Sequence, residues 1–227
     1  MKKTLIIGSI IFAVGFLIWL VVIMQDGFTF GYSDAKFTKK EQTFGEIKHL
    51  EYEGDADDLL IKYQENQNGI VYYDSAEMWY HITYNENTKT LKIEQETKNF
   101  ILGFNFPRNK EIIITIGNPL DSLELDLDAG DIDFEMVNIN RAEVNVDAGD
   151  VKFSNCQINT LSIEVDAGKI DYSGKIFQAF NGNVDAGEID LELAQNRNDF
   201  IVNGSGNGAI VIQAKVNLGK FDIEYND

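Results

Sequence analysis

The sequence predicts an all-β protein: a parallel β-solenoid of coils of about nineteen residues, with a strand-rich N-terminal lead-in and one transmembrane helix before it. The tripeptide Asp-Ala-Gly recurs at a constant spacing of nineteen residues, at 128–130, 147–149, 166–168 and 185–187. Apolar residues alternate with polar ones on both sides of each tripeptide, which is typical of short strands. An uncharged run of twenty residues, Leu5–Met24, follows Lys2 and Lys3. Repeats at a short fixed period predict stacked units that bury their apolar faces against one another.

The composition indicates a folded, acidic protein. The chain has 227 residues, with 37 Asp and Glu against 19 Lys and Arg, so its net charge is −18. This charge disfavours binding to nucleic acid, because a phosphate backbone would be repelled and few arginines are present to contact it. Cys156 is the only cysteine. An internal disulfide, a zinc site of several thiolates and a C-x-x-C redox centre are therefore excluded.

The N-terminus predicts a membrane anchor. A helix of twenty residues is about 30 Å long, which matches the hydrocarbon core of a bilayer. Lys2 and Lys3 precede this run, so the positive-inside rule places the N-terminus in the cytoplasm and the C-terminal domain outside it. A cleaved signal peptide is the alternative, because Ser33-Asp34-Ala35 offers small residues at a possible cleavage site. Residues 1–24 are thus a cytoplasmic stub and transmembrane helix, and residues 25–40 a linker.

Residues 41–118 predict a β-rich lead-in that covers one end of the stack. Turn residues separate the short runs, for example at Glu53-Gly54-Asp55 and at Asn85-Glu86-Asn87. A covered end prevents unpaired strands from recruiting other chains. The predicted strands are Phe44–Ile47, Leu59–Tyr63, Ile70–Tyr73, Trp79–Tyr84, Leu91–Glu94 and Ile112–Ile116.

Residues 119–199 hold the repeats, and residues 200–227 predict C-terminal strands and a second cap. Each repeat gives two strands joined at Asp-Ala-Gly, and equivalent residues of successive coils lie about 4.8 Å apart. Three residues before the aspartate, the repeats read Leu125, Val144 and Ile163, but the next has Gly182. The glycines Gly130, Gly149, Gly168 and Gly187 are predicted to take a positive φ at the turn.

Charges also follow the repeat. In register, Lys152 would lie between Asp133 and Asp171. Lys169 would lie between Asp150 and Glu188. Each exposed contact of this kind contributes a few tenths of a kcal/mol, about 0.3.

The aspartates of the tripeptide form a column of like charges, which requires an offset. Repulsion between neighbours at this spacing is about 1 kcal/mol even in water. In an Asx-turn each carboxylate accepts the backbone N–H two residues on. The alternative is a ladder of divalent cations such as Ca²⁺, although the nonapeptide of calcium-binding β-rolls is absent. The candidate metal ligands are Asp128, Asp147, Asp166 and Asp185.

An aromatic stretch in the lead-in supplies the candidate partner-binding residues. Trp and Tyr are enriched in the energetically dominant parts of interfaces. The alternative is that alternate aromatic side chains pack within the lead-in sheet. The candidates are Tyr72, Tyr73, Trp79 and Tyr80. Cys156 is predicted to be a semi-buried, inert thiol, because its column is of mixed polarity.

The sequence does not predict an enzyme, and no catalytic residue is assigned. His49 and His81 are the only histidines, and neither G-x-S-x-G nor H-E-x-x-H occurs. A paired-carboxylate site on glycans would have precedent among parallel β-helices. Acidic residues are so abundant here that adjacent carboxylates are expected on any surface.

The chain resembles the bacterial membrane-anchored β-strand-repeat "putative adhesin" proteins of unknown function, the DUF4097-like family. The resemblance covers roughly residues 41–225 and is carried by the membrane helix, Leu91–Glu94, Ile112–Ile116, Leu123–Leu125 and the repeated Val/Leu-Asp-Ala-Gly-x-Ile/Val. It implies a surface-exposed, membrane-anchored β-solenoid. Some relatives are similar to membrane proteins encoded beside envelope-stress signalling systems.

We therefore expect a non-catalytic binding or interaction module at the bacterial cell envelope. In one hypothesis it binds a membrane neighbour and acts in envelope stress, and in another it is an adhesin for extracellular or cell-wall ligands. A calcium-dependent structural role is a further alternative. No cofactor is expected apart from Ca²⁺, and the expected partners are the membrane of its own anchor, an envelope protein or a wall ligand.

Overall fold

The computed structural model describes residues 37–74, 78–97 and 111–225, and this part of the chain is built almost entirely of strands. The all-β, strand-rich prediction is confirmed. The predicted membrane helix lies outside the described residues, and within them no helix is long and apolar enough to cross a membrane. The elements are β1 Thr38–Thr43, β2 His49–Ala56, β3 Leu59–Tyr63, β4 Gly69–Asp74, β5 Met78–Asn85, β6 Thr90–Thr97, β7 Ile112–Ile116, β8 Leu120–Ala129, β9 Ile132–Glu135, β10 Asn138–Ala148, β11 Val151–Leu193, a 3₁₀ turn at Arg197–Asp199, β12 Phe200–Val202, β13 Ser205–Gly206 and β14 Ile210–Tyr225.

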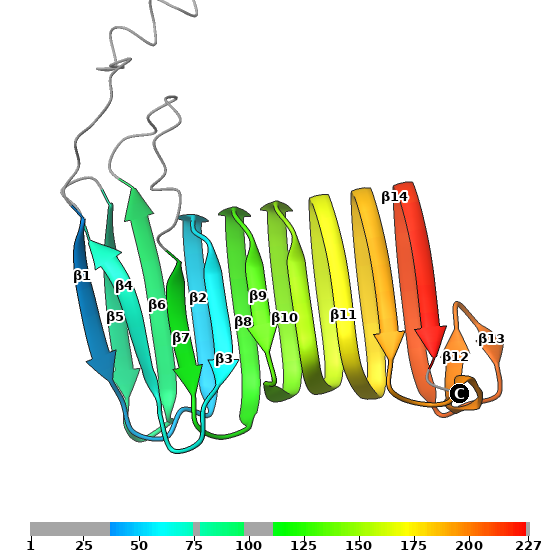
Figure 1. Ribbon diagram of the computed structural model, residues 1–227, viewed down its shortest axis with the longest axis horizontal. Coiled ribbons are helices and arrows are strands. Elements are labelled where there is room, and N and C mark those ends of the chain that lie inside the picture. The colour runs from blue at the N-terminus through cyan, green and yellow to red at the C-terminus, as the bar shows by residue number, and fades with distance from the viewer. Residues whose placement is uncertain (1–36, 75–77, 98–110, 226–227) are drawn as a thin grey trace, which may run out of the picture. The chain divides into compact units, whose positions relative to one another are not determined.

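The strands form one continuous curled sheet (Figure 1). Its order is β1-β4-β7-β3-β9-β11-β10-β8-β2-β6-β5, with β14 paired to β11. Successive repeats pair in parallel, so that Val144 of β10 lies opposite Leu125 of β8 and Ile163 of β11. This is the nineteen-residue register that the repeat predicts. β1 begins at Thr38, within the predicted 25–40 linker.

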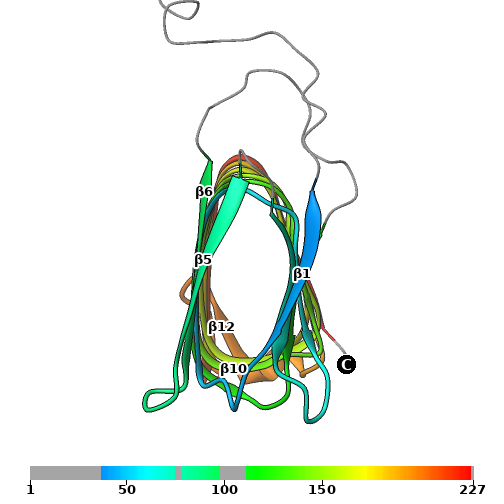
Figure 2. The same ribbon diagram turned by 90° about the vertical axis from the view of Figure 1, so that its left-hand side faces the viewer.

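Each repeat, called a coil below, has two legs, which are the strand segments before and after its Asp-Ala-Gly corner. The core lies between these legs, and Figure 2 shows β5 and β6 on one side of it and β1 on the other. Residues before each Asp-Ala-Gly, such as Leu123 and Leu127, face residues after it, such as Ile132, and all three are buried. Aromatic rings stack in the predicted column. Phe134 and Phe153 have ring centroids 4.4 Å apart, and Phe153 and Tyr172 follow at 5.4 Å. Stacking thus repeats the core from coil to coil.

The corner between the legs explains the repeated glycine. Gly149 has a φ of +154°, and a Cβ there would overlap the carbonyl oxygen of Gly130 in the preceding coil. Gly130, Gly168 and Gly187 also have positive φ and equally close backbone neighbours. A side chain would therefore be strained by the backbone angle and would also force adjacent coils apart.

The lead-in differs from the prediction in two places. Phe44–Ile47 is not a strand, and β2 runs through Glu53-Gly54-Asp55, where a turn was predicted. Pairing with β8 holds Gly54 opposite Leu127. The Tyr52 ring fills the space beside Gly54, since a Cβ there would lie 2.9 Å from its Cε1. Tertiary packing thus overrides the turn preference of Gly and Asp.

Two further coils have other residues at the position of the Asp-Ala-Gly tripeptide. In β2, Ala56 pairs with Ala129, so Asp55-Ala56-Asp57 occupies the Asp-Ala-Gly position. In β14, Leu218 and Gly219 pair with Ala186 and Gly187, and the offset widens to 32 residues, as between Asn217 and Asp185. β12 and β13 occupy the insertion. The stack therefore extends beyond the repeats recognisable in the sequence.

Candidate functional site

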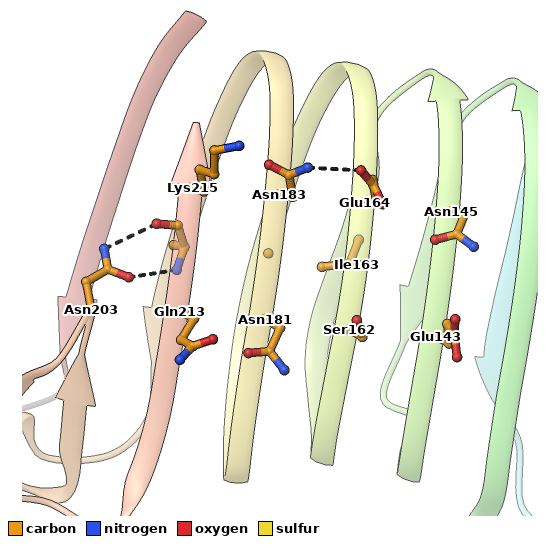
Figure 3. A pocket seen from close by; sticks show the side chains of 12 residues that line it. Glu143, Asn145, Ser162, Ile163, Glu164, Asn181, Asn183, Asn203, Gln213 and Lys215 are labelled. Carbon is orange, nitrogen blue, oxygen red and sulfur yellow. Dashed lines mark hydrogen bonds between the residues drawn. The ribbon is translucent and has the colours of Figure 1, made fainter. Parts of the chain in front are cut away.

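A shallow hollow of about 550 Å³ lies on the outer face of the legs that precede the Asp-Ala-Gly corner. It spans β10, β11 and β14, and the β12–β13 turn borders it through Asn203 (Figure 3). Outward side chains of equivalent positions in successive coils form two columns. One column holds Glu143, Ser162, Asn181 and Gln213, and the other holds Asn145, Glu164, Asn183 and Lys215.

The floor of the hollow is centred on Gly182, the residue that departs from the apolar column. Gly182 faces the core, and the ring of Phe180 takes the place of its side chain, because a Cβ would lie 2.6 Å from Phe180 Cε1. Phe180 is fully buried. The sheet thus remains packed from below while its outer surface carries only polar side chains.

Two hydrogen-bonded groups fix the walls of the hollow. Asn183 Nδ2 donates to Glu164 Oε1 across adjacent coils at 2.9 Å. Asn183 Oδ1 is buried and has no hydrogen-bond partner within the described residues. The Asn203 amide donates to the Ala214 carbonyl at 3.2 Å and accepts from the Ala214 N–H at 2.9 Å. The Asn203 side chain therefore makes the two hydrogen bonds that a neighbouring strand would make with β14 at Ala214.

The hollow combines uncharged hydrogen-bonding side chains with three charged ones, Glu143, Glu164 and Lys215. An amide side chain presents both donors and an acceptor, so a row of amides matches a ligand that carries hydroxyl or amide groups along its length. Asn181 and Gln213 are exposed, and their side chains make no hydrogen bond within the described residues. The spacing of about 4.8 Å between coils makes this row regular.

The predicted aspartate ladder lies exposed along the corner, beside this face. The Asx-turn prediction is wrong, because the N–H two residues on is used between coils. Gly130 N–H donates to the Ala148 carbonyl, and Gly149 N–H to the Ala167 carbonyl, both at 3.0 Å. Asp185 instead accepts a hydrogen bond from Asn217 Nδ2 at 2.6 Å.

A different column of carboxylates links the coils. Asp131 Oδ1 accepts the N–H of Asp150 at 2.9 Å, and Asp150 Oδ1 accepts the N–H of Lys169 at 2.8 Å. Partial burial, with repulsion from Asp147, Asp55 and Asp126, raises the pKa of Asp128. Among residues 37–74, 78–97 and 111–225, no group of three or more metal-ligating side chains could hold a metal ion, Asp128, Asp147, Asp166 and Asp185 included.

The lysine side chain in one predicted charge column pairs with aspartates of the neighbouring column. Lys169 lies in register beside Asp150, which accepts its backbone N–H, but its Nζ pairs with the neighbouring column, 2.6 Å from Asp190 and 3.7 Å from Asp171. Long lysine side chains reach the neighbouring column as easily as their own, so in-register stacking does not decide their partners. Lys152 makes no salt bridge within the part of the chain that the structure describes.

The aromatic stretch packs within the lead-in. Tyr72 is only 4% exposed, its ring lies edge-on to that of Tyr80 at 5.4 Å, and its hydroxyl accepts a hydrogen bond from Gln42. Tyr73 and Tyr80 are half-buried. Trp79 belongs to β5, but its side chain lies outside the described residues. Tyr72 and Tyr80 therefore contribute to the sheet interior rather than to an exposed cluster.

A buried carboxylate lies beside these rings. Asp57 is 8% exposed and accepts hydrogen bonds from Tyr52, and from Tyr80 at 2.6 Å. Burial raises its pKa to about 7, although the two phenol hydrogen bonds act in the opposite direction. Burial likewise raises the pKa of both tyrosines. Sequence reasoning missed Asp57, and its place in the tripeptide column was the available signal.

Cys156 is fully buried rather than semi-buried. Its Sγ lies 3.6 Å from the carbonyl oxygens of Phe134 and Ser154. Burial raises the pKa of the thiol to about 11. A thiol with this pKa is protonated at neutral pH and is a poor nucleophile.

The hollow was not predicted from the sequence. Its signals were the glycine at position 182 and the run of outward amides around it, but these amides come from coils separated by nineteen or more residues. Their proximity depends on the 32-residue offset of β14, which the repeat does not reveal.

The geometry defines a class of all-β proteins in which strands stack in parallel register and display rows of outward side chains. The family model described as Toastrack DUF4097 matches residues 47–226, and the chain belongs to this family. Comparison with curated proteins finds no match.

Several solved structures are similar over most of the chain. A "putative cell adhesion protein" from Clostridium sporogenes is 13% identical, with a TM-score of 0.45, over 84% of this chain and 100% of that one. A "putative adhesin" from Bacteroides fragilis is 14% identical, with a TM-score of 0.41, over 83% and 97%. A "Putative lipid binding protein" from Parabacteroides distasonis is 16% identical, with a TM-score of 0.32, over 86% and 98%. These similarities are too distant to transfer a function to this chain.

Proposed function

We propose that this chain is a non-catalytic binding module, anchored in the bacterial envelope by its N-terminal segment, whose outer hollow binds a neutral polymer rich in hydroxyl and amide groups. The row of outward amides over Gly182 is the observation that supports the proposal. Asn181 and Gln213 expose unused donors and acceptors, and Asn183 Oδ1 is buried without a partner. The proposal includes the interpretation of the stack as a parallel β-solenoid, which the nineteen-residue register supports.

The class of ligand follows from charge and spacing. A net charge of −18 repels polyanions, so phosphate-rich polymers are disfavoured. A glycan carries hydroxyl groups at regular intervals and can lie across successive coils, where each amide can donate and accept. Cell-wall glycan is the envelope polymer with this chemistry. An adhesin-like or stress-sensing role would both use such binding.

The test is calorimetric titration of the detergent-solubilised full chain with the tetrasaccharide of β-1,4-linked N-acetylglucosamine. Replacing Asn181 and Gln213 together by Ala is expected to weaken binding about tenfold, which corresponds to about 1.4 kcal/mol of lost hydrogen bonding. Gln157→Ala is the matched control, because it removes an exposed amide of the same stack that does not line the hollow. Equal affinities for the wild type and the double variant, or no heat with the wild type, would refute the assignment.

A further inference from the structure

The last strand of the stack has one unpaired edge. β14 pairs with β11 from Val211 to Tyr225. On its other edge, β12 pairs only with Ile210–Ile212, and the Asn203 amide bonds the backbone of Ala214. Within the described residues, no strand pairs with this edge beyond Ala214. Figure 1 shows β14 at the end of the row of strands, with β12 and β13 beside its lower end, where the rings of Phe200 and Tyr225 have centroids 5.6 Å apart.

The core is also incompletely covered at this end. Val216, Phe221 and Ile223 are half-buried, whereas residues at the same positions in the preceding coil are at most 2% exposed. Those buried partners are Val184, Ile189 and Leu191. Leu218 at the corner is 74% exposed. A further strand placed beside β14 would cover Val216, Phe221 and Ile223 as each coil covers the one before it. It would not bury Leu218, because Ala186 in the same column is exposed inside the stack.

At Phe221 and Ile223, the backbone N–H groups point toward the open edge of β14. In earlier coils the inward-facing residue after the corner donates its N–H to the next coil: Leu59 to Asp131 O, and Ile132 to Asp150 O, both at 2.9 Å. Phe221 aligns with Ile189 at this position of the repeat. Because N–H directions alternate along a strand, the N–H groups of Phe221 and Ile223 both face the open edge.

We propose that this edge pairs antiparallel with the same edge of a second copy of the chain, forming a two-fold dimer. Along the straight leg after the corner, the outward residues are Lys220, Asp222 and Glu224. When Phe221 faces Ile223 of the second copy, Lys220 faces Glu224, and the two Asp222 residues face each other. Lys220 already contacts Asp222 in its own chain, which offsets their repulsion. The edge is therefore self-complementary in both charge and apolar contact.

A two-fold arrangement also explains why the association would stop at two copies. A head-to-tail contact between opposite ends of the stack would leave a free edge at each step and form an open filament, whereas a two-fold contact closes after two copies. At the other end of the stack the sheet terminates in β1 on one leg and in β5 on the other. β1 presents Lys39, Lys40 and Glu41, all exposed, and charged side chains of this kind block edge pairing. The open edge of β14 thus fits its own copy better than it fits the opposite end.

Disulfide trapping tests the proposal in the full chain, in native membranes or in detergent. In the proposed register Asp222 forms a non-hydrogen-bonded pair with itself, at a Cα separation of about 4.5 Å that a disulfide can bridge. Asp222→Cys is expected to give a covalent dimer under mild oxidation. Asp133→Cys, in the same outward column but inside the stack, is the control and is expected to remain monomeric. The native Cys156 is buried and does not interfere.

Exchanging the charges at positions 220 and 224 distinguishes the proposed edge pairing from other contacts between two copies. In the Asp222→Cys background, Lys220→Glu is expected to reduce trapping at least fivefold, and Lys220→Glu with Glu224→Lys is expected to restore it. A monomer in every variant, trapping that ignores these substitutions, or a ladder of larger oligomers would overturn the two-fold edge. Trapping of Asp222→Cys to a different protein would also overturn it, because the occupant would then not be a second copy.

Discussion

The two ends of the strand stack are finished in different ways. At the N-terminal end, β4 and β5 run antiparallel to their neighbours β7 and β6, and β1 adds a further antiparallel strand of charged residues. At the C-terminal end, β14 remains parallel to β11, and within the described residues its other edge pairs with β12 over Ile210–Ile212 and with the Asn203 amide at Ala214. Repeats need terminal units with a polar outer face. The first end has such a unit, and the second has only part of one.

The interior positions show the same contrast. At the first end, Ile70, Leu91 and Ile93 are buried as completely as residues inside the repeats. At the second end, Phe221 and Ile223 are only partly buried. The difference indicates that the first end stabilises the fold, while the second leaves surface available for association.

The largest expected loss of stability comes from adding a methyl group where the backbones of adjacent coils are in contact. Gly149→Ala would place a methyl group against the Gly130 carbonyl at a φ of +154°, so we expect the free energy of unfolding to fall by about 3 kcal/mol or more. Urea denaturation measures this change. Gly204→Ala is the control: φ is +81° there, but a Cβ has no neighbour within 4 Å, so a loss of about 1 kcal/mol is expected. Equal losses at the two sites would contradict the close stacking of backbones.

The buried carboxylate at the N-terminal end predicts a pH dependence. Because the pKa of Asp57 rises from 3.8 to about 7 on folding, the folded state favours the protonated form. Its stabilising effect is complete below pH 4 and is lost as the pH rises through 7, a loss of up to about 4 kcal/mol. Asp57→Asn is expected to remove this part of the dependence between about pH 4 and 7, measured by thermal melting at each pH. A variant that retains the full dependence would show that other groups cause it.

The partial cap at the C-terminal end predicts a smaller effect. Asn203→Ala removes both side-chain hydrogen bonds to the Ala214 backbone, and we expect a loss of about 1 to 2 kcal/mol because one backbone donor and one acceptor lose their partners. Amide exchange at Ala214 should accelerate, while exchange at Ala142 in β10 should not change. Unchanged exchange at Ala214 would mean that another segment holds this edge.

The smallest effect concerns the thiol. Since burial raises the pKa of Cys156 to about 11, its alkylation by iodoacetamide at pH 7.5 is expected to be far slower than that of a free thiol. Unfolding in urea should restore the ordinary rate. Rapid alkylation of the folded chain would contradict full burial.

The repeat in the sequence predicted the parallel register because identical tripeptides must stack at a fixed offset. It did not predict the outer coils, because Asp57 and Asn217 replace the expected glycine and aspartate, and an insertion precedes β14. The candidate site was missed for the same reason: amides at 145, 181 and 213 become neighbours only when every coil is placed. Gly54 was predicted as a turn because local preference favours one, while pairing with β8 decides the outcome.

Hydrogen–deuterium exchange of the full chain at increasing protein concentration tests the contrast between the two ends most directly. The account predicts that amides of β14 around Phe221 and Ile223 exchange rapidly when dilute and become protected as concentration rises, while β5 and β6 exchange at rates independent of concentration. Protection of β14 equal to that of β11 at the lowest concentration, or no change across the series, would contradict an open C-terminal edge that pairs with a second copy.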